Sequence, residues 1–218
     1  MQIIDNINST VKGDLQTVIH KGSKLFIAAA CFSIYAYQEL KKQLEGIDEL
    51  RFIFTSPTFV TEKASKAQRE FYIPRISRER SLYGTEFEVK LRNELTQKAI
   101  AKECADWIRR KVTFKSNVTQ EQMMGFMTVD GSTYMPINGF TTVDLGCERG
   151  NNAYYPVQKT ESYENANYFL NLFEQLWNDK KKLQEVTDVV IENITAAYRE
   201  NPPEYIYFFA LYNIFKEF

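Results

Sequence analysis

The segment KLFIAAACFSIYAYQELKKQLEGIDELRFIFTSP, residues 24–57, decides the fold that we predict for this chain. It opens with a continuous apolar run of strand length, which is typical of a strand covered on both faces. A helical pattern then begins at the N-cap residue Ser33 and stops at Gly46, and a second strand-like run ends at Pro57. A strand, a helix and a strand in this order form a βαβ unit, which predicts a parallel sheet with a right-handed crossover.

The flanking sequence carries patterns of further elements. Helical spacing is visible, with Ser9 or Thr10 as the first N-cap, in residues 9–22, 86–111, 162–179, 183–201 and 202–218. Strand patterns cover residues 112–116, 121–137 and 153–160, and the second of these is a hairpin that turns at Asp130 and Gly131. We therefore predict one α/β domain over residues 1–180 and a helical extension over residues 181–218.

Composition limits the class of protein. The 218 residues are 44% hydrophobic, enough to bury the core of one domain. The three cysteines show no CxxC spacing, which argues against a disulfide framework and a zinc site and indicates a reducing compartment. The chain shows no signal-peptide pattern at its start and no apolar run of membrane-spanning length, so we expect a soluble cytoplasmic protein. Phosphate-loop, dinucleotide and HExxH motifs are absent, so no nucleotide, cofactor or metal is predicted for this chain.

Charge is distributed unevenly along the sequence. Residues 62–115 carry 14 Lys/Arg against 8 Asp/Glu, whereas residues 116–218 carry 7 against 14. Cations interleaved with aromatic rings are typical of phosphate contacts and base stacking, and this favours contact with a nucleic-acid backbone. The candidate residues are Tyr72, Arg75, Arg78, Arg80, Arg109, Arg110, Lys111 and Lys115. The alternative is a basic face that is solvated or docks on the acidic remainder, and the sequence pI near 6.0 counts against a strong nucleic-acid binder.

Three stretches resemble one family when they are taken in order. They are GSKLFIAAACFSIYAYQELKKQLEGIDELRFIFTSP, YMPINGFTTVDLGCERG with FLNLFEQLWND after it, and VTDVVIENITAAYRENPPEYIYFFALYNIFKEF. The first two resemble phospholipase-D-like domains at the N-terminus of bacterial Swi/Snf-like superfamily-two helicases. The third resembles the helical connector that leads into the ATPase motor of those enzymes. The resemblance implies a mixed α/β fold and membership of a DNA-processing enzyme.

The phospholipase-D motif is degenerate in this sequence. The family uses His-x-Lys-x4-Asp followed by a Gly-Ser-x-Asn-like turn, in which the histidine is the nucleophile and the lysine neutralises phosphate oxygens. The matching positions here are Met124 for the histidine, Phe126 for the lysine, Asp130 or Gly131 for the aspartate, and Gly139, Phe140, Thr141 and Thr142 for the turn. Neither the nucleophile nor the cation is present, so we predict a structural remnant without catalytic residues.

Other candidate nucleophiles have weaker patterns. His20 is the one histidine of the chain and stands at the end of a short predicted helix, where a surface or capping role is typical. Cys147 has no histidine near it in sequence, which favours an unreactive thiol. Asp144 and Glu148 form a carboxylate pair at i and i+4, which alone predicts no chemistry.

The resulting hypothesis is a non-catalytic accessory domain of a helicase-related ATPase that contacts the DNA backbone or positions the substrate. The resemblance implies that ATP and magnesium belong to a motor outside this chain, that residues 183–218 pack on that motor, and that the chain is truncated. A homodimer is a further expected partner, and no membrane partner is expected. Two alternatives remain: a diverged phosphodiesterase or nuclease, and a protein-interaction module used for dimerisation or motor docking.

Overall fold

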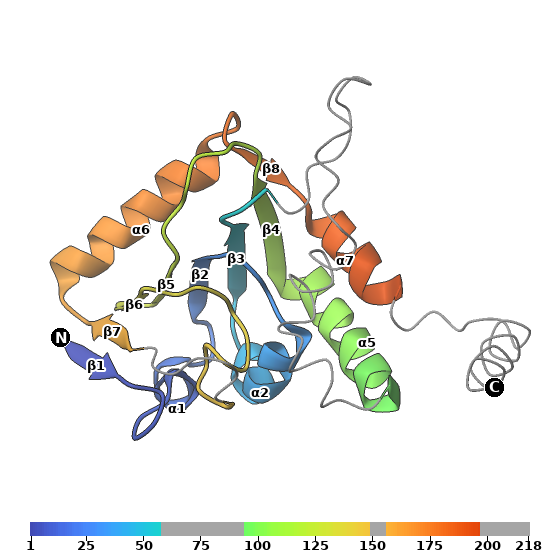
Figure 1. The fold of residues 1–218 in the computed structure, drawn as a ribbon, viewed down its shortest axis with the longest axis horizontal. Helices are drawn as coiled ribbons and strands as arrows, with labels where there is room; N and C mark the ends of the chain where they lie inside the picture. Colours follow the sequence, from blue (N-terminus) through green and yellow to red (C-terminus); the bar gives the residue numbers. More distant parts are fainter. Residues whose placement is uncertain (58–93, 149–155, 197–218) are drawn as a thin grey trace, which may run out of the picture.

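A computed structural model describes residues 1–57, 94–148 and 156–196, which build a mixed eight-stranded sheet flanked by helices (Figure 1). The strand order is β1-β7-β6-β5-β2-β3-β4-β8. The strands are β1 (Gln2–Ile4), β2 (Lys24–Ala29), β3 (Glu49–Phe54), β4 (Val112–Asn117), β5 (Phe126–Val129), β6 (Ser132–Met135), β7 (Val157–Thr160) and β8 (Leu183–Glu185). The helices are α1 (Val11–Val18), α2 (Ile34–Leu44), α5 (Glu94–Lys111), α6 (Tyr163–Asn178) and α7 (Thr187–Ala196).

The predicted βαβ unit is confirmed. β2 and β3 are parallel, with Lys24 opposite Glu49 and Ala29 opposite Phe54, and β4 continues the parallel block beyond β3. Helix α2 connects β2 to β3 and begins after Ser33, whose side chain accepts a hydrogen bond from the backbone N–H of Tyr35. This cap satisfies one of the N–H groups that a helix N-terminus leaves without an intrahelical partner.

The other strands are antiparallel additions to this block. β5 pairs with β2 and β6 with β5, through a hairpin whose turn includes Asp130 in a left-handed conformation with φ 46°. The predicted turn at Asp130 and Gly131 is thereby confirmed. β7 and β1 extend the sheet beyond β6, and β8 closes the other side against β4. The first and last described strands therefore lie at opposite edges of one sheet.

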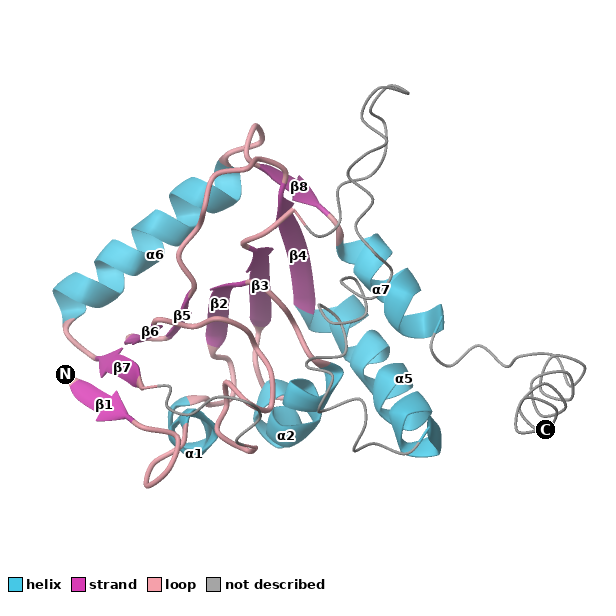
Figure 2. Ribbon diagram, viewed as in Figure 1, coloured by secondary structure: helices cyan, strands magenta, loops and turns pink. Residues whose placement is uncertain are grey.

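The two faces of the sheet are covered unequally (Figure 2). The larger core contains buried residues from α1, α2, α5 and α7, among them Trp107, whose indole N–H donates to the Leu44 carbonyl at 2.9 Å. On the other face a smaller aromatic core forms beneath α6, where Phe169, Phe173 and Trp177 pack on residues of β2, β3 and β5. In the described part of the chain, no helix is long and apolar enough to cross a membrane.

One predicted element is wrong in part. Residues 183–185 were expected to start a helix but form β8, and α7 begins only at Thr187. The reason is pairing with the open edge of β4, where Leu183 lies opposite Asn117 and Glu185 opposite Lys115. The predicted extension is thus described as far as residue 196, with β8 in the sheet and α7 in the main core. The helix predicted at 202–218 and residues 86–93 of the helix predicted at 86–111 lie outside the described residues.

A buried polar cluster attaches α1 to the strands β6 and β7. Lys159, whose side chain is only 6% exposed, bonds Asp14 at 2.9 Å and Glu161 at 2.8 Å, and the Tyr134 hydroxyl donates to Asp14 at 2.6 Å. Burial lowers the pKa of Lys159, but the hydrogen bonds to Glu161 and Asp14 outweigh it and raise that pKa above its ordinary value. Burial, and then the bond to Asp14, raises the pKa of Tyr134. The ammonium therefore stays charged inside the fold.

We predict that removal of the two carboxylates of this cluster lowers the free energy of unfolding by unequal amounts. We expect Asp14→Ala to lower the free energy of unfolding by about 3 kcal/mol, because it leaves the buried ammonium of Lys159 with one exposed partner. Glu161→Gln is the matched control, and with a side chain 66% exposed its cost should stay below about 1 kcal/mol. Urea denaturation at neutral pH measures both values, and equal costs would contradict the assignment.

Candidate functional site

The turn at residues 139–142, predicted to match the family's motif turn, lies at the carboxyl-terminal edge of the parallel strands. The residues that follow β2, β3 and β6 meet there with the start of β5 and are joined by backbone hydrogen bonds. Thr55 N–H donates to the Ala29 carbonyl at 3.0 Å, Ala30 N–H to Asn138 at 2.8 Å, and Ile137 N–H to Gly125 at 2.9 Å. In open α/β sheets, ligands bind at this edge of the strands.

The turn at residues 139–142 is built into the core. The Phe140 N–H donates to the Cys31 carbonyl at 2.8 Å, its carbonyl accepts from Ser33 at 2.9 Å, and its ring stacks on Phe32 with centroids 5.8 Å apart. Gly139 is required by a close approach, because a Cβ atom there would lie 2.5 Å from the Cys31 sulfur. The turn is therefore an internal connection of the fold.

The two threonines of this turn face the interior. Thr141 and Thr142 are buried, and the Thr141 hydroxyl donates to the Asp144 carboxylate at 2.5 Å while it accepts from the Asp144 backbone N–H at 3.2 Å. The backbone N–H of Leu145 also donates to the Thr141 carbonyl at 3.0 Å and closes this turn of the chain. The Thr141 side chain thus stabilises the turn from within.

The structure separates the remaining motif positions. Met124 is 51% exposed, whereas Phe126 is buried beneath α6, with its ring centroid 5.2 Å from that of Phe169 and 6.3 Å from that of Phe173. Asp130 lies at the opposite end of β5, where its carboxylate accepts from the Ser23 hydroxyl at 2.5 Å and the Lys24 N–H at 3.2 Å. Of these positions, the one that matches the lysine is thus filled by an aromatic core residue.

Of the residues predicted to contact a nucleic-acid backbone, the structure describes those in α5 and β4. The other four, Tyr72, Arg75, Arg78 and Arg80, lie outside the described residues. At the end of α5, Arg109 bonds Asp106 at 2.6 Å and Arg110 bonds Glu45 at 3.3 Å. The ammonium of Lys111 donates to the Ile47 carbonyl at 2.8 Å. These three cations are consecutive at the end of α5, and each has an intramolecular partner.

Lys115 is separated from that group by the sheet. Its ammonium donates to the Trp177 carbonyl at the end of α6 and lies 4.5 Å from the centroid of the Trp177 ring. A cation is favourable at a helix C-terminus, so Lys115 stabilises the docking of α6 on the sheet. The structure places Arg109, Arg110 and Lys111 in the last turn of α5 and Lys115 on the other face of the sheet.

The other candidate nucleophiles do not assemble into a site. His20 is exposed at the amino-terminal edge of β2, away from the turn at 139–142. Burial raises the pKa of the Cys104 thiol, and Cys147 is half-buried and packs against the main core. Among the described residues, no group of three or more His, Cys, Asp or Glu side chains is placed to hold a metal ion.

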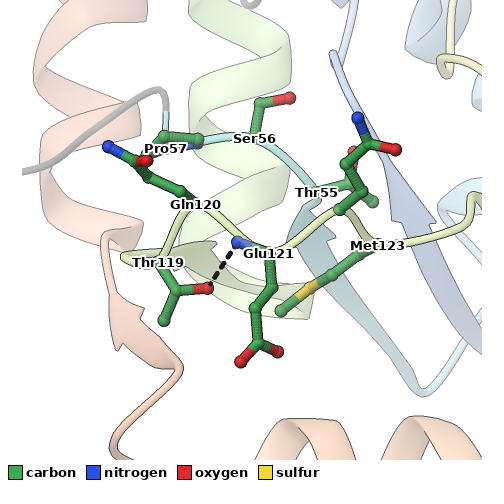
Figure 3. Close-up of a pocket in the computed structure, with 8 residues that line it drawn as sticks. Thr55, Ser56, Pro57, Thr119, Gln120, Glu121 and Met123 are labelled. Atoms are coloured by element: carbon green, nitrogen blue, oxygen red, sulfur yellow. Dashed lines mark hydrogen bonds between the residues drawn. The ribbon is translucent and has the colours of Figure 1, made fainter.

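A pocket of about 330 Å³ lies between the ends of β3 and β4 and was not predicted from the sequence (Figure 3). Its walls are the segment that follows β3 and the loop between β4 and β5. The lining residues are Thr55, Ser56, Pro57, Thr119, Gln120, Glu121, Gln122 and Met123. Polar residues directly after two neighbouring parallel strands were the signal that could have identified it.

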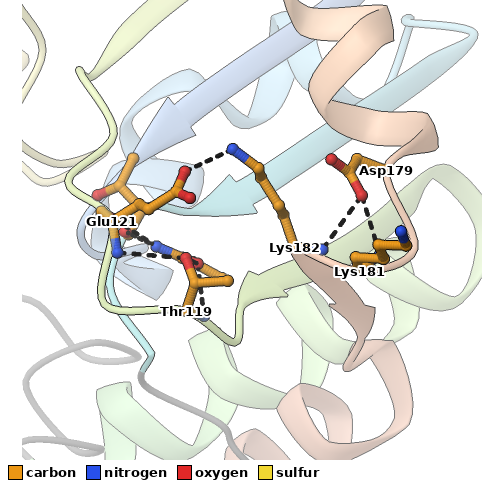
Figure 4. A network of polar contacts seen from close by, with 7 residues as sticks. Thr119, Glu121, Asp179, Lys181 and Lys182 are labelled. Carbon is orange, nitrogen blue, oxygen red and sulfur yellow. Dashed lines mark hydrogen bonds and ion pairs between the residues drawn. The ribbon is translucent and has the colours of Figure 1, made fainter.

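Buried polar side chains hold both walls of this pocket. The fully buried Asn117 amide donates to the Thr55 and Glu121 carbonyls, each at 2.9 Å, and its oxygen accepts from the Thr119 N–H and hydroxyl, each at 2.8 Å. Lys182 bonds the Glu121 carboxylate, and Asp179 accepts from the Lys182 backbone (Figure 4). The pocket is therefore preformed by contacts beneath it.

Comparison with known proteins gives only distant likenesses. No family model and no curated protein matches the chain. Among solved structures, the phosphatidylserine synthase of Haemophilus influenzae Rd KW20 superposes with a TM-score of 0.47 and 13% identity, over 90% of this chain and 43% of that one. TrmBL2, an archaeal chromatin protein described with a novel mode of DNA binding, gives a TM-score of 0.37 and 11% identity, over 85% of this chain and 52% of that one. At such values the likenesses establish neither a family nor a function.

Because this edge is closely packed, we predict very different stability costs for replacing two glycines of one hairpin with alanine. A Cβ at Gly125 would lie 1.7 Å from the Ile137 carbonyl oxygen, whereas a Cβ at Gly131 has no heavy atom of another residue within 4 Å beyond its chain neighbours. We expect Gly125→Ala to lower the free energy of unfolding by about 3 kcal/mol and Gly131→Ala by less than about 1 kcal/mol. Thermal and urea denaturation measure both, and a tolerated Gly125→Ala would refute the described pairing.

Proposed function

We propose that this chain is a catalytically inactive phospholipase-D-like domain that serves a helicase-related ATPase as an accessory module and contacts the DNA backbone. The observation that carries the proposal is the burial of Phe126 among the aromatic rings beneath α6. In the family that the sequence resembles, the matching position holds the lysine that neutralises the phosphate. Here the position belongs to the core of the fold.

The absence of catalysis is supported by the chemistry of the two remaining positions. Met124 has a thioether in place of a nucleophilic imidazole, and a thioether cannot accept a phosphoryl group and release it in the manner of histidine. The Thr141 hydroxyl is buried and bonded to Asp144. A domain that keeps the sheet and the turn without these groups fits a binding or positioning role.

Contact with the DNA backbone is supported by the charge of the segment that follows Pro57. Residues 62–115 carry an excess of six cations, and Pro57 lies on the wall of the pocket at the carboxyl-terminal edge. Arg109 and Arg110 remain predicted contacts whose half-exposed side chains could exchange Asp106 and Glu45 for phosphate oxygens. ATP, magnesium and the surface that receives the connector, predicted over residues 183–218, would belong to the motor of the parent enzyme. Within that connector, β8 and α7 already pack in this domain. A homodimer is proposed only as a further partner.

We predict that removal of the basic side chains reduces the salt dependence of DNA binding. We expect the fragment to bind labelled duplex, single-stranded or forked DNA with micromolar affinity, measured by fluorescence anisotropy at several salt concentrations. Arg75→Ala, Arg78→Ala and Arg80→Ala together should weaken binding and reduce the slope of log K against log salt by up to about 2.7, as expected for three lost phosphate contacts.

The matched control removes three exposed cations from the amino-terminal edge of the sheet and the end of α2, with Lys21→Ala, Lys24→Ala and Lys42→Ala. This variant has the same net charge and should retain most of the slope. Equal losses in the two triple variants would indicate a response to overall charge, and no binding of any DNA form at low salt would refute DNA contact by this fragment.

We predict that placing the family's histidine and lysine at positions 124 and 126 lowers stability and gives no phosphodiesterase activity. Phe126→Lys places an ammonium in the apolar core beneath α6 and removes an aromatic side chain, so we expect it to cost at least about 3 kcal/mol of unfolding free energy. Met124→Lys adds the same charge at an exposed position and should cost less than about 0.5 kcal/mol. Hydrolysis of a phosphodiester by the Met124→His, Phe126→Lys variant, or a stable Phe126→Lys variant, would contradict the proposed burial.

A further inference from the structure

The residues that line the pocket at the ends of β3 and β4 have no role in the proposed contact with the DNA backbone. The pocket lies between residues 55–57 and residues 119–123 and has a volume of about 330 Å³, within the size range of sites for small molecules. Its walls come from segments far apart in the sequence, which the parallel pairing of β3 and β4 places side by side. A site of this kind exists only in the folded protein.

Buried hydrogen bonds join its two walls. Asn117 uses both amide hydrogens and its oxygen to join the two segments, and the Ser116 hydroxyl donates to the Ser56 carbonyl at 3.4 Å. Both side chains are fully buried, so these bonds are protected from competing water. A preformed site lowers the ordering cost of binding.

The lining is suited to a neutral, flat ligand with hydrogen-bonding edges. Gln120 and Gln122 are exposed, and within the described part of the chain neither side-chain amide bonds another residue. Primary amides present a donor and an acceptor together, the pattern that pairs with the edge of a nucleobase. Pro57 and Met123 supply apolar surface against which a ring can pack, as in sites for flipped bases.

The same lining disfavours a phosphate group. Of its side chains, all of which belong to the described residues, none is cationic. The nearby ammonium of Lys182 is bonded to the Glu121 carboxylate at 2.5 Å. An anion would find no cation in the lining to offset its charge, so the pocket selects the uncharged part of a nucleotide.

We propose that this pocket binds a single unpaired nucleobase of a DNA strand. The inference deepens the proposed function and rests on it for the delivery of the strand, whose backbone the basic segment would hold. The amides of Gln120 and Gln122 read the edge of the base, and Pro57 and Met123 pack against its ring. Adenine is the preferred base, because the amide fork of glutamine matches its adjacent donor and acceptor.

Methyl NMR of the whole chain tests the pocket directly. The protein contains five methionines, and labelling their methyl groups with carbon-13 gives a signal for Met123 in the lining and one for its neighbour Met124, which is not part of the lining. Titration with each of the four free 2′-deoxynucleosides should shift the Met123 signal saturably, with Kd on the order of 1 mM and deoxyadenosine the tightest. Met124→Leu and Met123→Leu assign the two signals.

Variants of the amides show whether they read the base. We expect Gln120→Ala with Gln122→Ala to weaken deoxyadenosine binding at least about fivefold, as for the loss of a paired base contact. Gln16→Ala, an exposed glutamine on α1, is the matched control and should leave the titration unchanged. An unshifted Met123 signal, or an equal response to 2-deoxyribose alone, would overturn the proposal.

The failure of this inference is distinguishable from the failure of the proposed function. Salt-dependent DNA binding that needs Arg75, Arg78 and Arg80, combined with no nucleoside effect on Met123, overturns the pocket and leaves the backbone-binding role. A saturable, amide-dependent nucleoside effect without binding of any DNA form supports the pocket as a nucleobase site and overturns the backbone-binding role.

Discussion

The antiparallel pairing of β5 with β2 is the constraint on which the rest of the structure depends. It places Phe126 opposite Ala28 and Val129 opposite Leu25, so the start of β5 lies at the edge where the parallel strands end. Because side chains alternate along a strand, the same register directs Phe126 and Ala28 to the α6 face, and Met127 to the main core. The residue at the start of β5 is therefore part of the second core.

Much of the fold could be predicted from residue patterns, because local signals and tertiary structure agree there. The apolar runs on either side of α2 predict two parallel strands, and Asp130 with Gly131 predicts the hairpin turn. β1 and β8 were not predicted, since each has only three residues and forms by pairing with a strand already in the sheet. Their conformation is set by a distant partner.

The site was predictable only where it is continuous in sequence. The turn at residues 139–142 is one continuous stretch, although the burial of Thr141 depends on contacts that no spacing reveals. The pocket is different, because its walls are joined by a bond between Asn117 and Thr55, which are 62 positions apart. Likewise, the charge pattern of the sequence includes Lys115 among the cations. It does not indicate that Lys115 bonds the Trp177 carbonyl at the end of α6.

The pairing of β1 with β7 has a consequence for the order of folding during synthesis. Gln2 lies opposite Lys159, so the first strand cannot find its neighbour until more than 150 further residues have been made. At ribosomal speeds of roughly 5–20 residues per second, this delay is on the order of ten seconds. The unit of β2, α2 and β3 can form much earlier, because its contacts are local. The edge strand therefore joins the sheet only after β7 has been made, and until then Ile4, which is buried in the folded protein, is accessible to other chains.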